Sequence, residues 1–599
     1  MAAIDWAIVA AYLLLCLLVG VLFTRKAGES VEQYFISGRN LPWWLVGTSM
    51  VATSFSSDTP LVVTGWVRRF GISYNWIWWS FAIGGMFSVF LLARLWRRAE
   101  VVTDVELTEL RYGGKPAAIL RGFRGAYLAL PVNCITLAWV IVAMVKLMRV
   151  VLGLHPVLTV ALCLLLTVVY AVLSGFWGVV VTDLFQFALA MAGCIVLSVL
   201  TVARLGGLGA LRAQARGTSP LGARLTDFFP RPPAGVGVLD GRFWSGPFFA
   251  FVVFLFVQWW ANKNADGGGV VVQRMCAAKD ERHSLLATLW FNFANYALRP
   301  WPWILVALGS VVLFPTVANE DAYPAVMKAL CGPGIMGLMV VAFLGAFMST
   351  VDTHLNLSAA YFVNDVYRRF LRRDASQAHY VLVSRIASLV VMLVAAGIAL
   401  KADSISGLFT FLLAFSSGFG LVLVLRWFWW RVNAWSELSA MVASGAISIL
   451  LYVLKHWVRL QALASLSEQG ILLITVVGST IIWLVVTFLT APVGAERLLT
   501  FYRKVRPFGA WGPVARRSGL PPAKGLGRMV VNWLAGTAMV LGATFATGKF
   551  LLGEMAQGWL YLAVTILGGL IILPELRRPS PPGGESERPG AVSPTDVTF

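Results

Sequence analysis

Long apolar runs dominate this sequence, and they restrict what it can fold into more than any other feature. Roughly fifteen stretches approach the length of about 20 mostly apolar residues that an α-helix needs to cross the hydrocarbon core of a bilayer. Their approximate cores are 4–23, 43–66, 76–92, 126–151, 156–173, 179–203, 244–272, 285–314, 334–362, 381–400, 405–425, 438–454, 470–489, 530–545 and 559–573. The sequence therefore predicts an all-α polytopic membrane protein with about 15 transmembrane segments.

The composition excludes several other classes of protein. Hydrophobic residues make up 58% of the chain and charged residues only 13%, which is about half the charged share of a soluble domain. The six cysteines form no CxxC pair, so we interpret them as packing residues and expect no disulfide framework or zinc site. The formal charge of +20 raises nucleic acid as a partner, but the basic residues lie mostly between apolar runs. We expect membrane lipid around the protein and no nucleic acid.

The distribution of basic residues predicts the orientation, because cytoplasmic loops carry an excess of Lys and Arg. An N-terminus outside the cell places most of these residues in cytoplasmic loops; the basic loop 204–242 is the exception, and it is long enough to be translocated despite its charge. Asp5 lies at the start of the first apolar run and Arg25 and Lys26 follow it, the reverse of a cleavable signal peptide. We predict an N-out, C-in, multi-pass protein of the cell (inner) membrane.

Two apolar runs are interrupted by residues that disfavour a helix. In residues 50–60, six of eleven positions are Ser, Thr or Asp, and Pro60 follows them. Residues 262–269 read Asn-Lys-Asn-Ala-Asp-Gly-Gly-Gly, and glycines are costly inside a helix. Unwound backbone survives at membrane depth only where it is buried in protein or lines a watery cavity. We favour a shared cavity near the midplane over a simple loop at the first break and a close helix crossing at the second.

The spacing of the two interrupted runs supports this interpretation. They are the second and seventh apolar runs, so they lie five segments apart and cross the membrane in opposite directions. Two inverted repeats of five helices, each opening with a broken helix, would give this arrangement. Free carbonyl groups at such a break can coordinate a cation, and exposed helix N-termini can hold an anionic group.

A polar stripe crosses the ninth apolar run. Ser349, Asp352, Thr353 and Asn356 share one helix face, which should point into the bundle. Hydroxyl and carbonyl oxygens suit a hard cation such as Na⁺, although Ser and Thr often only bond the preceding turn. We interpret the neighbouring His354 as a structural histidine.

One acidic residue lies near the start of the sixth run. Asp183 either neutralises a basic loop or lines a route for ions, and the chemistry of the sequence leaves both interpretations open.

Several stretches carry a resemblance to a known family. They are residues 34–44, 103–113, 174–186, 273–279, 348–356 with 364–367, and 431–435. In this order, across roughly the first four fifths of the chain, the sequence resembles the sodium:solute symporter family, which includes sodium/proline, sodium/glucose and sodium/pantothenate carriers.

The resemblance implies a LeuT-like 5+5 inverted-repeat bundle with extra peripheral helices, sodium coupling and alternating access. Carried over by position, the family's sodium site falls on two carbonyls of the first break, then on a carbonyl and two hydroxyls of the ninth run: Ala52, Phe55, Ala346, Ser349 and Thr350. The same comparison places Asp183 near the ion exit, and we add Asp352 as a second carboxylate of the ion path.

The substrate side differs from the familiar members of the family. Ser54 stands where the sodium/proline carriers place an aspartate, and Asp58 follows one turn later. Asn264 stands where the sodium/sugar carriers place an aromatic residue. The candidates for contact with substrate, each of which could equally be part of the wall or cap of the cavity, are Asp58, Asn75, Trp76, Gln258, Asn262 and Asn264.

The sequence predicts five regions. They are an N-terminal helix and loop (1–42), an inverted-repeat transport core (43–428), two peripheral helices (429–490), a basic cytoplasmic loop with a C-terminal helix pair (491–574), and a disordered tail (575–599). The C-terminal pair either spans the membrane or forms one re-entrant or peripheral hairpin.

We therefore expect a sodium-coupled secondary symporter that imports a small polar organic solute, with Na⁺ as the coupling ion and no organic cofactor. A proton-coupled carrier that titrates Asp58, Asp183 or Asp352 is the alternative on the same scaffold. An integral-membrane transferase using His354 and Asp352 lacks a nucleotide, metal or lipid-phosphate motif, so we do not expect an enzyme. The sequence specifies neither the solute nor the oligomeric state.

Overall fold

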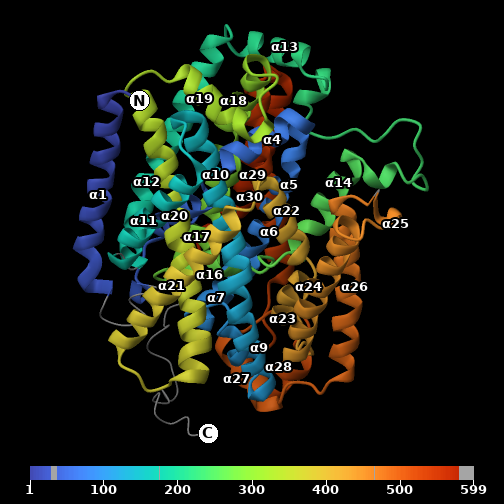
Figure 1. Cartoon of the computed structure of the whole chain (residues 1–599). Helices are drawn as coiled ribbons and strands as arrows, with labels where there is room; N and C mark the ends of the chain where they lie inside the picture. Colours follow the sequence, from blue (N-terminus) through green and yellow to red (C-terminus); the bar gives the residue numbers. More distant parts are fainter. Residues whose placement is uncertain (28–36, 174–175, 465, 579–599) are drawn as a thin grey trace.

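The computed structural model describes residues 1–27, 37–173, 176–464 and 466–578, and the regular structure within these ranges is helical (Figure 1). Ten described helices are long and apolar enough to cross a membrane, or eleven if one bent pair counts as a span. Three shorter apolar helices accompany them. The predicted all-α polytopic class is confirmed, whereas the count of fifteen segments and the orientation stay predictions.

Residues 43–428 contain two consecutive sets of helices. The first set contains α3 (Trp43–Ser54), α4 (Thr59–Phe70), α5 (Trp76–Trp79), α6 (Phe81–Phe87), η3 (Ser88–Leu92), α7 (Ala93–Ala99), α9 (Gly114–Tyr127), η4 (Leu128–Val132), α10 (Asn133–Leu152), α11 (Pro156–Leu173) and α12 (Phe176–Arg204). The second contains α14 (Pro247–Val253), η7 (Phe254–Gln258), α15 (Trp259–Ala261), α16 (Gly268–Ala277), α17 (Glu281–Phe293), η8 (Ala294–Leu298), α18 (Pro300–Leu313), α20 (Ile335–Ala360), η10 (Tyr361–Leu371), α21 (Gln377–Ala399), α22 (Ile405–Phe415) and α23 (Gly420–Phe428).

The first predicted break is confirmed between α3 and α4. Phe55 leaves the helix with an extended backbone (φ −96°, ψ 91°), and α4 begins only at Thr59. Pro60 occupies the first turn of α4, where its missing N–H costs no helical hydrogen bond. One helix therefore stops after Ser54, and the next begins at Thr59.

The second predicted break is confirmed between α15 and α16. Gly267 and Gly268 adopt φ values of +117° and +71°, a region that residues with a side chain rarely enter. At Gly269 an added Cβ would lie 1.9 Å from Tyr361 Oη. These glycines are required by the backbone shape and by close packing.

A third break was not predicted. Residues 405–425 were expected to form one uninterrupted segment, but α22 and α23 meet at an angle of 46°. The unwound Gly418 donates its N–H to Ser444 Oγ (2.9 Å), and its carbonyl accepts from Ser479 Oγ (2.9 Å). Hydroxyls on neighbouring helices replace the lost helical bonds, which is how broken backbone is tolerated in a membrane.

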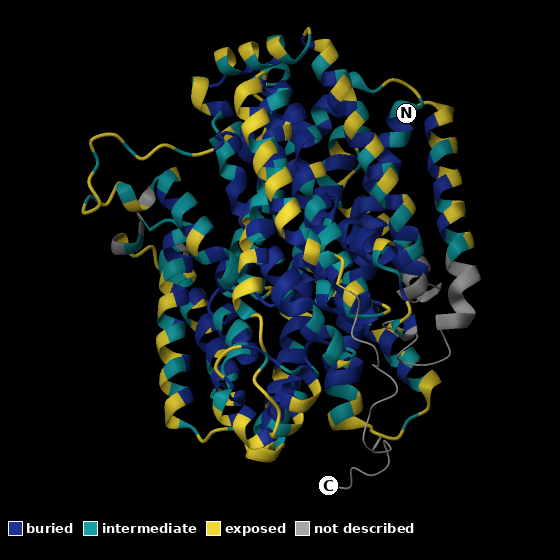
Figure 2. Ribbon diagram, turned by 180° about the vertical axis from the view of Figure 1, so that it is seen from behind, coloured by how far each residue is buried: buried dark blue, intermediate teal, exposed yellow. Residues whose placement is uncertain are grey.

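The broken helix α3 lies at the centre of the bundle. It packs against α12, α16, α17 and α20, so both sets of helices contact it. Buried residues fill the interior, and exposed residues lie on outer helices and at both ends of the molecule (Figure 2).

Additional helices surround the core. The first, α1 (Ala3–Ala27), packs on α12 and α20. Asp5 Oδ1 accepts hydrogen bonds from the N–H groups of Gly334 (2.7 Å) and Gly337 (2.8 Å), so it caps the start of α20. On the opposite side, α24 (Ala434–His456) packs against α26 (Glu468–Leu489).

The C-terminal helices form an antiparallel pair. Both α29 (Leu526–Leu551) and α30 (Met555–Leu576) are long and apolar enough to span a membrane. Trp301 Nε1 donates to the carbonyl of Thr544 (2.8 Å), whose hydroxyl donates to the carbonyl of Tyr296 (2.8 Å). The pair is therefore attached to η8 and α18 through α29.

Other predictions concern the cysteines and the C-terminal tail. All six cysteines are free thiols. α30 continues to Leu576, and the predicted disordered tail lies outside the described residues from position 579 onward.

Substituting Gly548 with alanine should destabilise the protein. An added Cβ would lie 1.8 Å from Trp301 Cζ2, and overpacking of this kind costs about 1–3 kcal/mol. Gly527→Ala, on the same helix and with no atom within 4 Å of the added carbon, is the control. Thermal unfolding in detergent should show a lower midpoint for Gly548→Ala only; equal midpoints for both variants would contradict the packing of α29.

Candidate functional site

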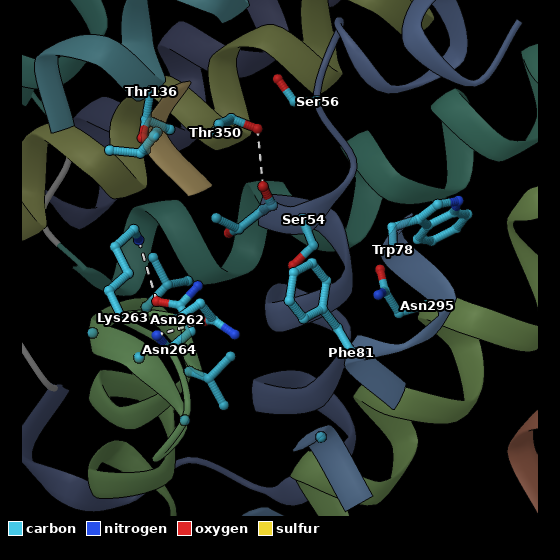
Figure 3. A pocket seen from close by; sticks show the side chains of 18 of the residues that line it. Ser54, Ser56, Trp78, Phe81, Thr136, Asn262, Lys263, Asn264, Asn295 and Thr350 are labelled. Carbon is cyan, nitrogen blue, oxygen red and sulfur yellow. Dashed lines mark hydrogen bonds between the residues drawn. The ribbon is translucent and has the colours of Figure 1, made fainter. Parts of the chain in front are cut away.

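A cavity of about 380 Å³ lies between the two broken helices (Figure 3). The predicted pocket enclosed by the two breaks is therefore confirmed. Its polar wall includes Thr53, Ser54, Ser56, Asp58, Asn262, Lys263, Asn264, Asn295, Arg299, Thr350 and His354. Aromatic rings, among them Trp66, Trp78, Phe81, Trp139, Tyr296 and Phe409, form much of the remaining wall.

An arginine caps the carbonyl end of α3. Arg299 donates from Nη1 to the carbonyl of Val51 (3.2 Å) and from Nη2 to that of Ser54 (2.8 Å). Its guanidinium lies 5.1 Å from the ring centroid of Phe55 and 5.2 Å from that of Trp303. A cation is favourable here because the end of a helix exposes carbonyls with partial negative charge.

The predicted sodium residues come together at the same helix end. Thr350 Oγ1 donates to the carbonyl of Thr53 (3.0 Å) and is 3.1 Å from that of Ala346. The carbonyl of Ala52 accepts the N–H of Phe55 at 3.0 Å. α20 thus presents a hydroxyl to the unwound end of α3, one residue from Ala52.

The other predicted hydroxyl bonds to a buried carboxylate. Ser349 Oγ donates to Asp183 Oδ1 and Ser49 Oγ donates to Asp183 Oδ2, each at 2.5 Å. Arg274 Nη2 lies 3.6 Å from Asp183 Oδ2, and neither side chain is exposed. Asp183 therefore pairs with a cation inside the bundle and connects α3, α12, α16 and α20.

Arg274 also organises the polar stripe on α20. Its Nη2 donates to Thr53 Oγ1 (2.9 Å) and Thr353 Oγ1 (2.8 Å), and its Nε donates to Ser49 Oγ (2.9 Å). Thr53 and Thr353 also contact each other at 3.0 Å. One guanidinium thus ties together three hydroxyls from two helices.

Two further residues of α20 differ in their surroundings. Asp352 is buried, and its Oδ2 has no hydrogen-bond partner among the described residues. Asp352 is not part of the cavity wall. His354 lines the cavity, and its Nδ1 lies 2.8 Å from Asn133 Oδ1, which gives this histidine the partner expected of a structural residue.

The substrate candidates fall into two groups. Asp58, Asn262 and Asn264 line the cavity. The other three lie outside its wall and bond to nearby protein groups: Asn75 to Ile72 and Trp78, Trp76 to Phe228, and Gln258 to Ile77 and Ser80.

Buried ion pairs connect the cavity wall to one end of the bundle. Tyr361 Oη, in the wall, donates to Asp104 Oδ1 at 2.5 Å. Arg124 pairs with Asp104 (2.8 Å) and with Glu437 (3.2 Å), and Arg426 pairs with Glu437 (3.3 Å). Charges that alternate in sign in this way satisfy one another in a low-dielectric interior.

The same network reaches the second break. Arg426 Nη2 pairs with Asp266 Oδ2 at 2.5 Å, and Trp96 Nε1 donates to the carbonyl of Asp266 (2.7 Å). The turn between α15 and α16 is therefore held by α7 and α23.

A neighbouring cluster of charges joins α8 (Leu107–Arg111) and α9 to η10. Arg121 pairs with Glu109 and with Asp365, both at 2.7 Å, and Arg369 pairs with Glu109 at 2.9 Å. Burial raises the pKa of Glu109, but the hydrogen bonds and charges of Arg121 and Arg369 outweigh it and hold that pKa below its usual value.

Two broken helices around a common cavity, with hydroxyls of a third helix at the open carbonyl end of the first, define a secondary transporter. Residues 34–444 match the sodium:solute symporter family, and the chain belongs to this family.

Similar proteins include a sodium/mannose cotransporter of Bos taurus, 26% identical over 490 residues, which covers 75% of this chain and 79% of that protein. A sodium/glucose cotransporter of Vibrio parahaemolyticus is 24% identical over 486 residues, covering 75% of this chain and 85% of that protein. Sodium/myo-inositol cotransporter 2 of Sus scrofa is 26% identical over 491 residues, covering 75% and 70%. The protein is a sodium-coupled solute symporter.

The fold is shared with a solved structure. A substrate-bound, outward-open Na⁺-coupled sialic acid symporter superposes with a TM-score of 0.67 at 19% sequence identity, covering 82% of this chain and 99% of that one. This likeness shows the LeuT-like fold that the sequence predicted.

Sequence reasoning missed three cations as parts of the site: Lys263, Arg274 and Arg299. Arg274 lies in one of the stretches that carry the family resemblance, so that stretch was the available signal. Lys263 lies inside the predicted second break, and Arg299 directly precedes a proline at the start of α18. Their partners lie on distant helices, which only the fold brings together.

Removing the cation beside Asp183 should be strongly destabilising. Arg274→Met leaves a buried carboxylate without its partner, which costs about 3–5 kcal/mol. Adding Asp183→Asn removes the orphaned charge, so the double variant should regain part of the lost stability. A double-mutant cycle on unfolding of the detergent-solubilised protein measures this coupling, and strictly additive effects would rule out the pairing.

Proposed function

We propose that this symporter imports a small polar organic solute by alternating access, with Na⁺ bound between α3 and α20. The proposed ligands are the carbonyls of Ala52, Phe55 and Ala346 and the hydroxyls of Ser349 and Thr350. The observation that carries this assignment is the contact of Thr350 Oγ1 with the carbonyl of Thr53 at the unwound end of α3. Rotation of the hydroxyl hydrogen would leave oxygen lone pairs for a hard cation.

Asp183 and Asp352 are proposed to attract the ion and to pass it through the bundle. Asp183 holds the hydroxyl of Ser349, so a carboxylate already contacts one proposed ligand. Asp352 is buried one turn further along α20. Negative charge near the site favours a cation in a medium of low dielectric constant.

The solute is proposed to bind in the cavity between the breaks. Asp58, from the first break, and Asn262 and Asn264, from the second, supply polar contacts in this wall. We propose a structural role for the other three candidates, because their side chains bond to neighbouring protein groups and do not line the cavity: Asn75, Trp76 and Gln258.

The proposed orientation in the cell membrane is N-out and C-in. In Figure 1 the start of α1 and α13 (Leu208–Thr218) lie at one end of the molecule, and α27 (Ala495–Val505) and α28 (Gly512–Ser518) lie at the other. Basic residues lie on α27 and α28, which favours a cytoplasmic location for this end of the molecule. We also propose the division of the chain into the five regions given above and a total of about 15 transmembrane segments.

Removing both hydroxyls should weaken sodium binding. Ser349→Ala with Thr350→Ala deletes two of the five proposed oxygen ligands, so the sodium concentration needed for half-maximal stabilisation should rise at least about tenfold. The measurement is the thermal midpoint of the purified protein as NaCl replaces choline chloride. Ser384→Ala is the control, because its buried hydroxyl bonds to the carbonyl of Tyr380 in the preceding turn of its own helix. An unchanged sodium midpoint in the double variant would reject this site.

Labelling of single cysteines tests the orientation. In a background with the six native cysteines replaced, Leu239→Cys should react with a membrane-impermeant maleimide in intact cells, because this loop is proposed to lie outside. Arg517→Cys, on α28, should react only after permeabilisation. Both positions are exposed, and the reverse labelling pattern would overturn the N-out assignment.

A further inference from the structure

The cavity contains a cation, Lys263, for which the described residues provide no ion pair. Lys263 lies in the turn between α15 and α16 and lines the cavity. Its Nζ donates to Asn264 Oδ1 at 3.2 Å, and no carboxylate of the described residues lies within 4.0 Å of it. Figure 3 shows Lys263, Asn262 and Asn264 gathered at this break, with Trp78, Phe81 and Asn295 on the other side of the pocket. Lys263 is half-buried in the wall and its contact with Asn264 is exposed, so an anion that enters the cavity can reach the ammonium group.

The other charged groups of the wall leave Lys263 as the cation available to a ligand. Asp104 pairs with Arg124 and accepts from Tyr361. Arg299 is held by the backbone carbonyls of α3. Asp58 lines the cavity at the first break, and its buried Oδ1 has no hydrogen-bond partner within the described part of the chain. The cavity therefore offers a cation at one break and an acceptor at the other.

The backbone next to Lys263 also favours an anion. α16 begins at Gly268, and Gly267, Gly268 and Gly269 all line the cavity. The first N–H groups of a helix have no acceptor within the helix and carry partial positive charge. A carboxylate at this place would meet an ammonium, an amide and a helix N-terminus together.

We propose that Lys263 binds the carboxylate of the transported solute, so that the substrate is a small organic acid with hydrogen-bond donors directed to Asp58. This inference rests on the proposed function, because it assumes that the solute occupies the cavity between the breaks. The sugars and polyol after which the similar cotransporters are named, mannose, glucose and myo-inositol, carry no charge, so this chain would differ from them in substrate class.

Matched pairs of probes test the inference on the purified full-length protein in NaCl. The acids are lactate, galacturonate and alanine, and their partners without a carboxylate are lactamide, galactose and alaninamide. At least one acid should raise the thermal midpoint and enter proteoliposomes in a sodium-dependent way, while its partner does neither. Lys263→Met should weaken the response to that acid at least about tenfold, and Lys263→Arg should keep most of it. Lys504→Met, at an exposed pair with Glu100, is the control.

Two outcomes would overturn the inference. The first is an equal shift of the thermal midpoint by an acid and by its partner, with the same shift in Lys263→Met. The second is a protein that sodium alone stabilises but whose thermal midpoint none of the acids shifts. Stabilisation by sodium without solute also shows that Lys263→Met is folded. A wild-type protein that does not respond to sodium would instead contradict the proposed sodium site.

Discussion

The open carbonyl end of α3 is the constraint on which the rest of the structure depends. A helix that stops inside a membrane leaves carbonyls that lipid cannot satisfy. Here Arg299, at the start of α18, binds two of them, and Thr350 of α20 binds a third. These bonds hold the start of α18 and the middle of α20 at the end of α3. The same polar groups surround the place where a coupling ion is proposed to bind.

The second break follows a different physical logic. Its glycines adopt backbone conformations that are not helical. The ion pair between Asp266 and Arg426 holds the turn in place. That pair continues through Glu437 and Arg124 to Asp104 in the cavity wall. Alternating charges therefore link the turn of the second break to the cavity wall and to α9, α23 and α24.

Local chemistry explains what the sequence could predict. Glycine, proline and clustered hydroxyls act on their own backbone, so both breaks around Pro60 and Gly267 were visible, as was the stripe on α20. The break at Gly418 had a local signal that was overlooked, because Ser416, Ser417 and Gly420 accompany it. Its stabilising hydroxyls, however, belong to Ser444 and Ser479, on two other helices. The pairing of Arg274 with Asp183 depends on the meeting of α16 and α12. Interactions of this kind follow from the tertiary arrangement and leave no local pattern.

The attachment of the C-terminal pair has a mechanical consequence. α29 packs on α6, η3 and η8 of the core, whereas α30 packs chiefly on α29 and exposes large apolar side chains, among them Trp559, Leu560 and Leu567. Any rocking of the core helices beneath α29 would carry α30 with it through the surrounding acyl chains. The turnover rate would then respond to bilayer thickness and lipid order, since these determine how much the annular lipids must rearrange in each cycle.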